Sequence, residues 1–357
     1  MEKLCVIFGG ASCEHDISII TAMQLCKNLE KKYKIEKIYL GLDNSFYLAT
    51  QVTDISYFED KKKIKLKPIM ISGRKIYVKN VFWKKYCEIA CLINCCHGGV
   101  GENGDLAGFC NVNDIPYTSA DCLPSHIAMD KSLAKKLLDG IVPTVLGVQV
   151  DEENFEEKVK YIRENLNDDL IVKPNSLGSS IGVKACDKMN FTEQIEAIFL
   201  LNDSALVENR IEDMEEYNQA CFVSNGEIKL SAIENPISKS KFLSFDEKYL
   251  SGKTKGTDRI LPAKISLNME KRINDYTALI YKTLKLNGLV RIDYIYDKLN
   301  DILYFNEVNT IPGSMAFYLY EPLGIDYISL IESLIENVKD NKKYSYFDTA
   351  VLRKKLL

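Results

Sequence analysis

Two acidic residues, an amide and an arginine lie close together between residues 288 and 313. Arg291 and Asp293 belong to one apolar-rich run, and Glu307 and Asn309 belong to the next. Carboxylate and amide oxygens suit Mg²⁺, which commonly completes its coordination shell with substrate phosphates. These side chains could therefore hold Mg²⁺ for chemistry on a phosphate. A solvated hairpin with a surface ion pair is the alternative that this stretch alone leaves open.

Two strands joined by a short turn are needed to position these side chains. The polar run at 297–301 separates the two apolar runs and is typical of a hairpin connection. Side chains two positions apart on a strand share a face, so Arg291 lies beside Asp293 and Glu307 beside Asn309. If the strands pair, one sheet face carries all four polar groups. Burying such a face is costly unless a ligand binds there.

Glycine-rich turns follow other predicted strands. A strand at 3–8 leads into Gly9-Gly10 and a helix from 17 to about 30, for which Ser12 or Asp16 could be the N-cap. The glycine pattern matches neither a dinucleotide fingerprint nor a Walker A loop. A strand at 88–94 ends in a turn with His97 and four glycines, a position at which open α/β sheets bind ligands. A glycine-rich surface loop is the alternative there.

A further turn, rich in glycine and serine, suits phosphate binding. It covers residues 173–183, between two predicted strands, and its backbone N–H groups could surround phosphates. Lys173 at its start, and Lys131 on a helix predicted for 125–139, could add positive charge. The polar run at 238–258 lacks periodicity, and a run of this length is usually either a functional lid or a disordered segment.

The bulk composition excludes several classes of protein. A chain of 357 residues with 46% hydrophobic and 27% charged residues predicts two or three globular domains. A net charge of −4 without a long basic block argues against nucleic-acid binding. The 11 cysteines lack paired metal spacing and fit a reducing cytoplasm. We expect neither a signal peptide nor a membrane span.

The glycine-rich stretches, together with Asn-Glu-Val-Asn-Thr-Ile-Pro-Gly at 306–313, resemble the D-alanine–D-alanine ligases of the ATP-grasp superfamily. The resemblance covers residues 4 to about 340 and rests on several motifs in the same order. It implies a three-domain α/β fold. Residues 1–122 would form a substrate-binding domain with an open parallel sheet. Residues 123–212 and 213–357 would form two α+β domains that grip ATP, the last with the metal site. Residues 238–256 would be a lid that closes over nucleotide.

The resemblance also implies the reaction and its cofactors. ATP would phosphorylate the carboxylate of a first amino acid, and the amine of a second would attack the acyl phosphate. Two Mg²⁺ ions, or Mn²⁺ in their place, would be held by Asp293, Glu307 and Asn309. ATP would be bound by Lys131, Lys173, Ser180, Glu208, Lys248 and Glu216, with Glu215 as the alternative ribose carboxylate.

Further residues would face the amino acids, again by resemblance. Glu14 would receive the ammonium group of the first amino acid, and His97 would line the same subsite. Ser179 would hydrogen-bond toward Glu14 and Tyr249, a residue of the lid. Arg291 and the backbone N–H of Gly313 would face the oxyanion of the tetrahedral intermediate.

The segment after Gly313 departs from the family. The family's Ser-Leu pair binds the carboxylate of the second amino acid, and Tyr318-Leu319 replaces it here. A phenol can donate one hydrogen bond, but it is bulkier and reshapes the pocket. We therefore expect a cytoplasmic, homodimeric enzyme that makes D-alanyl-D-alanine for peptidoglycan. The alternatives are a ligase with D-serine, D-lactate or another amino acid as second substrate, and a non-catalytic ATP-binding paralogue.

Overall fold

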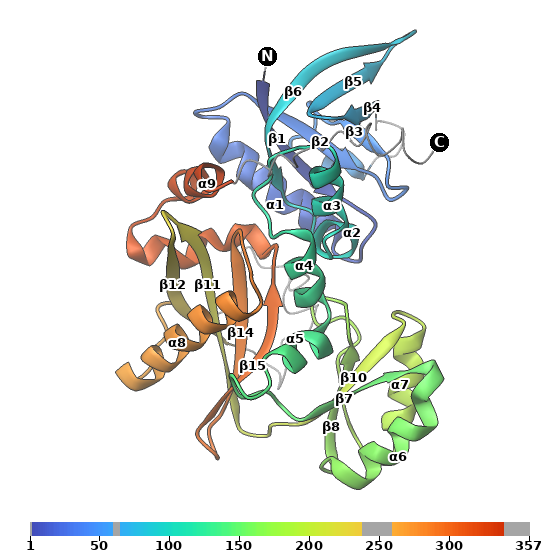
Figure 1. Cartoon of the computed structure of the whole chain (residues 1–357), viewed down its shortest axis with the longest axis vertical. Coiled ribbons are helices and arrows are strands. Elements are labelled where there is room, and N and C mark those ends of the chain that lie inside the picture. Colours follow the sequence, from blue (N-terminus) through green and yellow to red (C-terminus); the bar gives the residue numbers. More distant parts are fainter. Residues whose placement is uncertain (1, 60–64, 238–258, 339–357) are drawn as a thin grey trace, which may run out of the picture.

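The structure is a computed structural model that describes residues 2–59, 65–237 and 259–338. It contains three β-sheets with helices packed around them (Figure 1). Each sheet falls within one of the three expected segments, whose boundaries stay a prediction. The expected lid at 238–256, with Lys248 and Tyr249, lies outside the described residues. Within the described ranges, no helix has both the length and the apolar character to cross a membrane.

The N-terminal sheet is built around its first strand. β1 pairs in parallel with β2 and β6, as expected, but the other neighbours are antiparallel and the strand order closes on itself. An open parallel sheet is therefore a correct description only around β1. The strands are β1 (Glu2–Gly9), β2 (Ile35–Leu40), β3 (Phe46–Leu48), β4 (Lys67–Ser72), β5 (Lys75–Lys79) and β6 (Trp83–Asn94). The helices are α1 (His15–Leu29), the 3₁₀ helix η1 (Ile55–Phe58), α2 (Gly99–Glu102) and α3 (Asp105–Val112).

A pair of short helices leads into the second sheet. The single helix expected at 125–139 is wrong, because the chain forms α4 (Cys122–Met129) and α5 (Lys131–Leu137). Asp130 separates them with extended backbone, and its side chain accepts a hydrogen bond from the N–H of Leu133 as an N-cap. Both helices pack against β15. This break places Lys131 at the first position of a helix that faces the last sheet.

The second sheet is antiparallel, in the order β7-β10-β8-β9. Its apolar side chains pack against two helices, with Ile162 and Ile195 fully buried. The strands are β7 (Gly147–Asp151), β8 (Asp169–Pro174), β9 (Lys184–Asp187) and β10 (Ser204–Asn209). The helices are η2 (Glu152–Asn154), α6 (Phe155–Asn165) and α7 (Phe191–Phe199).

The third sheet has the order β13-β12-β11-β14-β15 and is antiparallel throughout. The predicted hairpin is confirmed as β14 and β15. Alternation buries Ile292 and Tyr294 in the core beneath α8 and turns Arg291 and Asp293 to the other face. The strands are β11 (Met214–Ser224), β12 (Glu227–Pro236), β13 (Arg259–Ile260), β14 (Val290–Asp297) and β15 (Ile302–Asn309). The helices are α8 (Leu267–Thr283), η4 (Gly313–Leu319), η5 (Glu321–Leu323) and α9 (Tyr327–Glu336).

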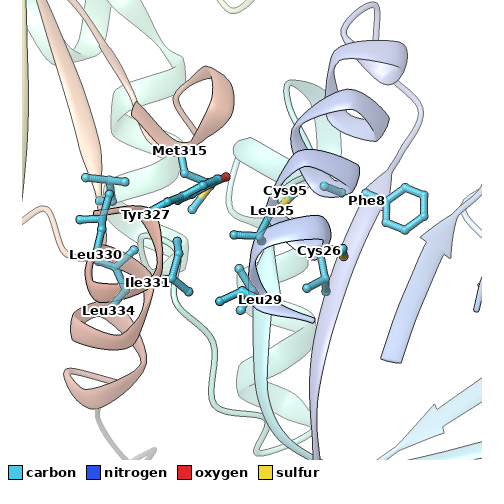
Figure 2. Packing of buried hydrophobic residues seen from close by; sticks show 14 of the residues in the cluster. Phe8, Leu25, Cys26, Leu29, Cys95, Met315, Tyr327, Leu330, Ile331 and Leu334 are labelled. Atoms are coloured by element: carbon cyan, nitrogen blue, oxygen red, sulfur yellow. The ribbon is translucent and has the colours of Figure 1, made fainter. Parts of the chain in front are cut away.

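One hydrophobic cluster joins the two ends of the described chain. Leu25 and Leu29 of α1 face Leu330 and Ile331 of α9, with Met315 of η4 beside them (Figure 2). Burying such side chains contributes about 1.5–3 kcal/mol each. The cluster therefore holds the segment after Gly313 against the first sheet.

Candidate active site

A cavity of about 390 Å³ is lined by residues from all three sheet regions. This volume lies within the range of small-molecule sites, roughly 300–1,000 Å³. Most of the predicted site residues line it, although they come from distant parts of the chain. They are Glu14, His97, Lys131, Lys173, Ser179, Ser180, Glu208, Glu216, Arg291, Asp293, Glu307, Asn309, Gly313 and Tyr318.

The third sheet presents a row of polar side chains to the cavity. Glu234, Asn218, Asp293 and Glu307 are direct partners on neighbouring strands β12, β11, β14 and β15. Directly opposed side chains lie about 5 Å apart on one face. The pairing therefore brings together carboxylates and an amide that are up to 89 positions apart in the sequence, counted from Asn218 to Glu307.

The expected metal ligands lie at one end of this row. Asn309 Nδ2 donates to Asp293 Oδ2 at 3.1 Å, and Arg291 binds both carboxylate oxygens of Asp293 at 2.7 Å each. Lys131 Nζ lies 3.5 Å from Glu307 Oε2. Two carboxylates and an amide form a hard oxygen donor set, so these residues fit Mg²⁺. Among the residues that the structure describes, no group of three or more acidic, histidine or cysteine side chains forms a metal cluster.

Two lysines share one buried carboxylate at the second sheet. Lys173 Nζ lies 2.6 Å from Glu208 Oε2, and Lys135 donates to Oε1 of the same group. Burial by itself would raise the pKa of Glu208, but the two lysines outweigh it and lower that pKa to about 2. Glu208 is thus an anion between two cations, and the group carries a net positive charge that suits phosphates.

The two candidate ribose carboxylates point in opposite directions. Glu216 lines the cavity. Glu215 accepts a hydrogen bond from Tyr217 Oη at 2.5 Å and lies 3.9 Å from Lys298, at the end of the hairpin. Neighbouring residues on a strand alternate between faces. The geometry therefore favours Glu216.

The turn before α1 meets the loop after β8. Ser179 donates a hydrogen bond to Glu14, as expected. A Cβ atom at Gly178 or Gly98 would lie 2.7 or 2.8 Å from a Glu14 carboxylate oxygen, so a side chain at either position would displace that carboxylate, and the φ of +62° at Gly98 also favours glycine there. The predicted N-cap of α1 is wrong, because Glu14 holds the N-cap position without a capping bond, and Ser12 Oγ donates instead to the carbonyl of His97 at 2.6 Å.

His97 and Glu102 connect the first sheet to the end of β15. Burial lowers the pKa of His97 to about 4, so this side chain is neutral at physiological pH, with Nε2 2.9 Å from Thr21 Oγ1. The Glu102 carboxylate accepts hydrogen bonds from the N–H groups of Gly98, Thr310 and Ile311 at 2.9–3.1 Å. Glu102 therefore fixes the segment between Asn309 and Gly313.

Comparison with known proteins decides the family. The family described as "D-ala D-ala ligase N-terminus" matches residues 3–120, and "D-ala D-ala ligase C-terminus" matches residues 142–336. The D-alanine–D-alanine ligase of Thermosipho melanesiensis is 33% identical over 367 aligned positions, which cover 100% of this chain and 99% of the relative.

This chain belongs to the D-alanine–D-alanine ligase family.

Solved structures of ligases agree with this assignment. The D-alanine–D-alanine ligase of Helicobacter pylori has a TM-score of 0.79 and 28% identity, with 95% of this chain and 99% of that chain covered. The VanG D-Ala:D-Ser ligase of Enterococcus faecalis has a TM-score of 0.81 and 27% identity, with the same coverage. The three-domain ATP-grasp fold expected from the sequence is the fold of these ligases.

Other predicted residues of this ligase lie away from the cavity or outside the described ranges. The side chain of Leu319 is fully buried in the cluster between α1 and α9, so the side chain is not available to a substrate. Lys248 and Tyr249 lie outside the described residues.

Sequence reasoning missed four ionisable residues of the cavity region: Glu102, Lys135, Glu234 and Arg259. Lys135 lies four positions after Lys131 and thus on the same helix face, a signal that could have identified it. Nothing in the local sequence distinguishes Glu234 or Arg259 from surface charges.

Proposed function

We propose that this chain is an ATP-dependent ligase that joins two molecules of D-alanine for peptidoglycan synthesis. The observation that carries the proposal is the single cavity that brings the Glu14–Ser179 pair, the lysine-bound Glu208 and the Asp293–Glu307 face together. Family membership supports ATP as a substrate. A non-catalytic ATP-binding paralogue is disfavoured, because the relatives that match the whole chain are named as ligases and because ATP binding alone would not need the amino acid subsite at Glu14 and His97.

ATP lies between the second and third sheets in this proposal. Lys131 and Lys173 hold its phosphates as point charges, and the loop residue Ser180 contributes beside them. Glu208 keeps Lys173 in place, and Glu216 binds the ribose. Lys248 of the expected lid also binds ATP in this proposal, and Tyr249 lies near Ser179. Both residues lie outside the described ranges.

Asp293, Glu307 and Asn309 hold Mg²⁺, and the ion neutralises phosphate charge when bound. The first amino acid places its ammonium group on Glu14, in the subsite that neutral His97 also lines. Its carboxylate oxygen attacks the terminal phosphorus of ATP, ADP leaves, and an acyl phosphate remains.

The second amino acid then attacks the acyl carbon. Its amine, freed of one ammonium proton, forms the C–N bond. The bond from carbon to the phosphate oxygen breaks, phosphate leaves with the electron pair, and the nitrogen loses its extra proton to solvent. Arg291 and the N–H of Gly313 stabilise the oxyanion that forms between these events.

The test compares acceptors directly. Purified protein is incubated with ATP, Mg²⁺ and D-alanine alone, or with D-alanine plus D-serine or D-lactate, and products are measured by mass spectrometry together with phosphate release. D-alanyl-D-alanine from D-alanine alone is the expected product. If the protein turns over only with another acceptor, that acceptor and not D-alanine is the second substrate. No turnover with any pair would favour the non-catalytic ATP-binding paralogue.

A cytoplasmic location is also proposed. All 11 cysteines lie within the described residues and are free thiols, which supports a reducing cytoplasm. The homodimer expected from the family is likewise proposed here.

A further inference from the structure

A second arginine, Arg259, lines the cavity near Arg291 and Tyr318. It begins the edge strand β13, whose pairing with Pro236 places it next to Glu234 of β12. About a third of its side chain is exposed, so a ligand in the cavity can reach it.

Neighbouring groups hold the guanidinium of Arg259 in a defined position. Arg259 Nη1 lies 3.1 Å from Glu234 Oε1, and its central carbon lies 4.3 Å from the ring centroid of Tyr318. Glu234 is nearly fully buried and also accepts a hydrogen bond from Asn218 at 3.1 Å. A guanidinium has five N–H donors, so its contact with Glu234 leaves donors for a planar carboxylate.

The other polar groups on this side of the cavity already have protein partners, and the proposed reaction assigns the remaining donors of Arg291 to the oxyanion. The phenol of Tyr318 donates its single hydrogen to Glu234 Oε2 at 3.2 Å. Burial, with a smaller contribution from Glu234, raises the pKa of Tyr318 to about 12, so the phenol stays protonated. Arg291 binds both oxygens of Asp293. To donate to a substrate carboxylate, Tyr318 would have to give up its hydrogen bond to Glu234.

We propose that Arg259 binds the carboxylate of the second amino acid, and that Glu234 and Tyr318 are positioning residues for its guanidinium. This assignment rests on the proposed function. It makes Arg259 the group that distinguishes acceptors with a carboxylate from acceptors without one. In place of a small hydroxyl, the cavity offers a cation stacked on an aromatic ring. An acceptor without a carboxylate would leave Arg259 paired with Glu234 alone and would gain no charged contact from it.

A competition experiment tests the assignment. D-alanine serves as first substrate, and equal concentrations of D-alanine and D-alaninamide compete as acceptors with ATP and Mg²⁺. The ratio of D-alanyl-D-alanine to its amide reports acceptor selectivity and is independent of the amount of active protein. We expect the acid to dominate with the wild-type chain and the ratio to fall about 10- to 100-fold in Arg259→Met. Arg259→Lys should give an intermediate ratio.

Arg272→Met is the matched control, because Arg272 of α8 pairs with exposed Asp301 at 2.9 Å, does not line the cavity and should leave the ratio unchanged. An unchanged ratio in Arg259→Met would overturn the inference. If that variant forms no dipeptide, hydroxylamine replaces the acceptor. Continued formation of D-alanyl hydroxamate would then support the inference, and its loss would overturn it. A wild-type chain that forms neither dipeptide would overturn the proposed function, and with it this assignment.

Discussion

Ser179 donates a hydrogen bond to Glu14, although 165 positions separate the two residues in the sequence. Glu14 precedes α1 in the first sheet region, and Ser179 lies in the loop between β8 and β9. Ser179 adopts a left-handed conformation with φ of 54°, in which L-residues are uncommon. The bond thus ties the proposed phosphate loop to the proposed subsite of the first amino acid.

Removing the charge of Glu14 should impair the first chemical step. Glu14→Gln keeps an oxygen that can accept from Ser179 but no longer neutralises an ammonium group. We expect kcat/KM for D-alanine, measured as hydroxamate formation with hydroxylamine, to fall about 100-fold while KM for ATP changes less than about twofold. The exposed neighbour Asp16 provides the control as Asp16→Asn, which should retain activity. A larger effect on ATP than on D-alanine would assign Glu14 a different role.

Glu307→Gln should remove turnover with little effect on folding. It replaces one of two carboxylates that we propose as Mg²⁺ ligands, and we expect kcat to fall at least about 1,000-fold. The thermal midpoint should stay within about 3 °C, because the side chain is only partly buried. Glu227→Gln, at the exposed start of β12, is the control. A normal rate with unchanged dependence on Mg²⁺ would contradict the metal assignment.

Lys135→Met should weaken ATP binding without changing the amino acid subsites. It leaves Glu208 with Lys173 as its remaining lysine partner, so Glu208 attracts Lys173 more strongly away from phosphate. We expect KM for ATP to rise about tenfold while KM for D-alanine is preserved. The adjacent exposed Lys136, changed to Met, should behave as the wild type. Equal effects of the two variants would show that the shared carboxylate is unimportant for ATP.

Glu102 should make stability depend on pH in a defined direction. Burial, with a smaller contribution from the charge of Glu14, raises the pKa of Glu102 from its ordinary 4.5 to about 7. Between these values the folded chain binds more protons than the unfolded chain, so this group's contribution to stability falls as pH rises. The free energy of unfolding of the wild type, relative to Glu102→Gln, should decrease by up to about 3 kcal/mol between pH 4.5 and 7.

Urea denaturation of both chains at pH 5 and pH 8 measures this difference. Glu227→Gln serves again as the control, since a hydrogen bond from Lys229 lowers the pKa of exposed Glu227, the opposite direction to the shift at Glu102. Parallel pH curves for the wild type and Glu102→Gln would show that Glu102 does not titrate between the two pH values.

The local sequence determined the elements that carry the chemistry. Alternation predicted the hairpin at β14 and β15 and placed Arg291 with Asp293 on one face, because a strand repeats every two residues. Asn225-Gly226, a dipeptide typical of hairpin turns, joins β11 and β12, and both residues have positive φ angles of 51° and 79°. The order of the glycine-rich motifs was sufficient to recognise the family. Such motifs are recognisable because glycine adopts backbone conformations that other residues rarely adopt.

Only the tertiary structure decided which charges meet. Strand pairing across the third sheet brought Glu234 and Asn218 into line with Asp293, and the edge strand β13 added Arg259. Glu216 lines the cavity and Glu215 does not. Leu319 is buried in the cluster between α1 and α9, so its side chain cannot contact a substrate. The physical reason is that a side chain's local pattern fixes the face on which it lies, whereas its partners are set by strand register and by contacts between segments far apart in the chain.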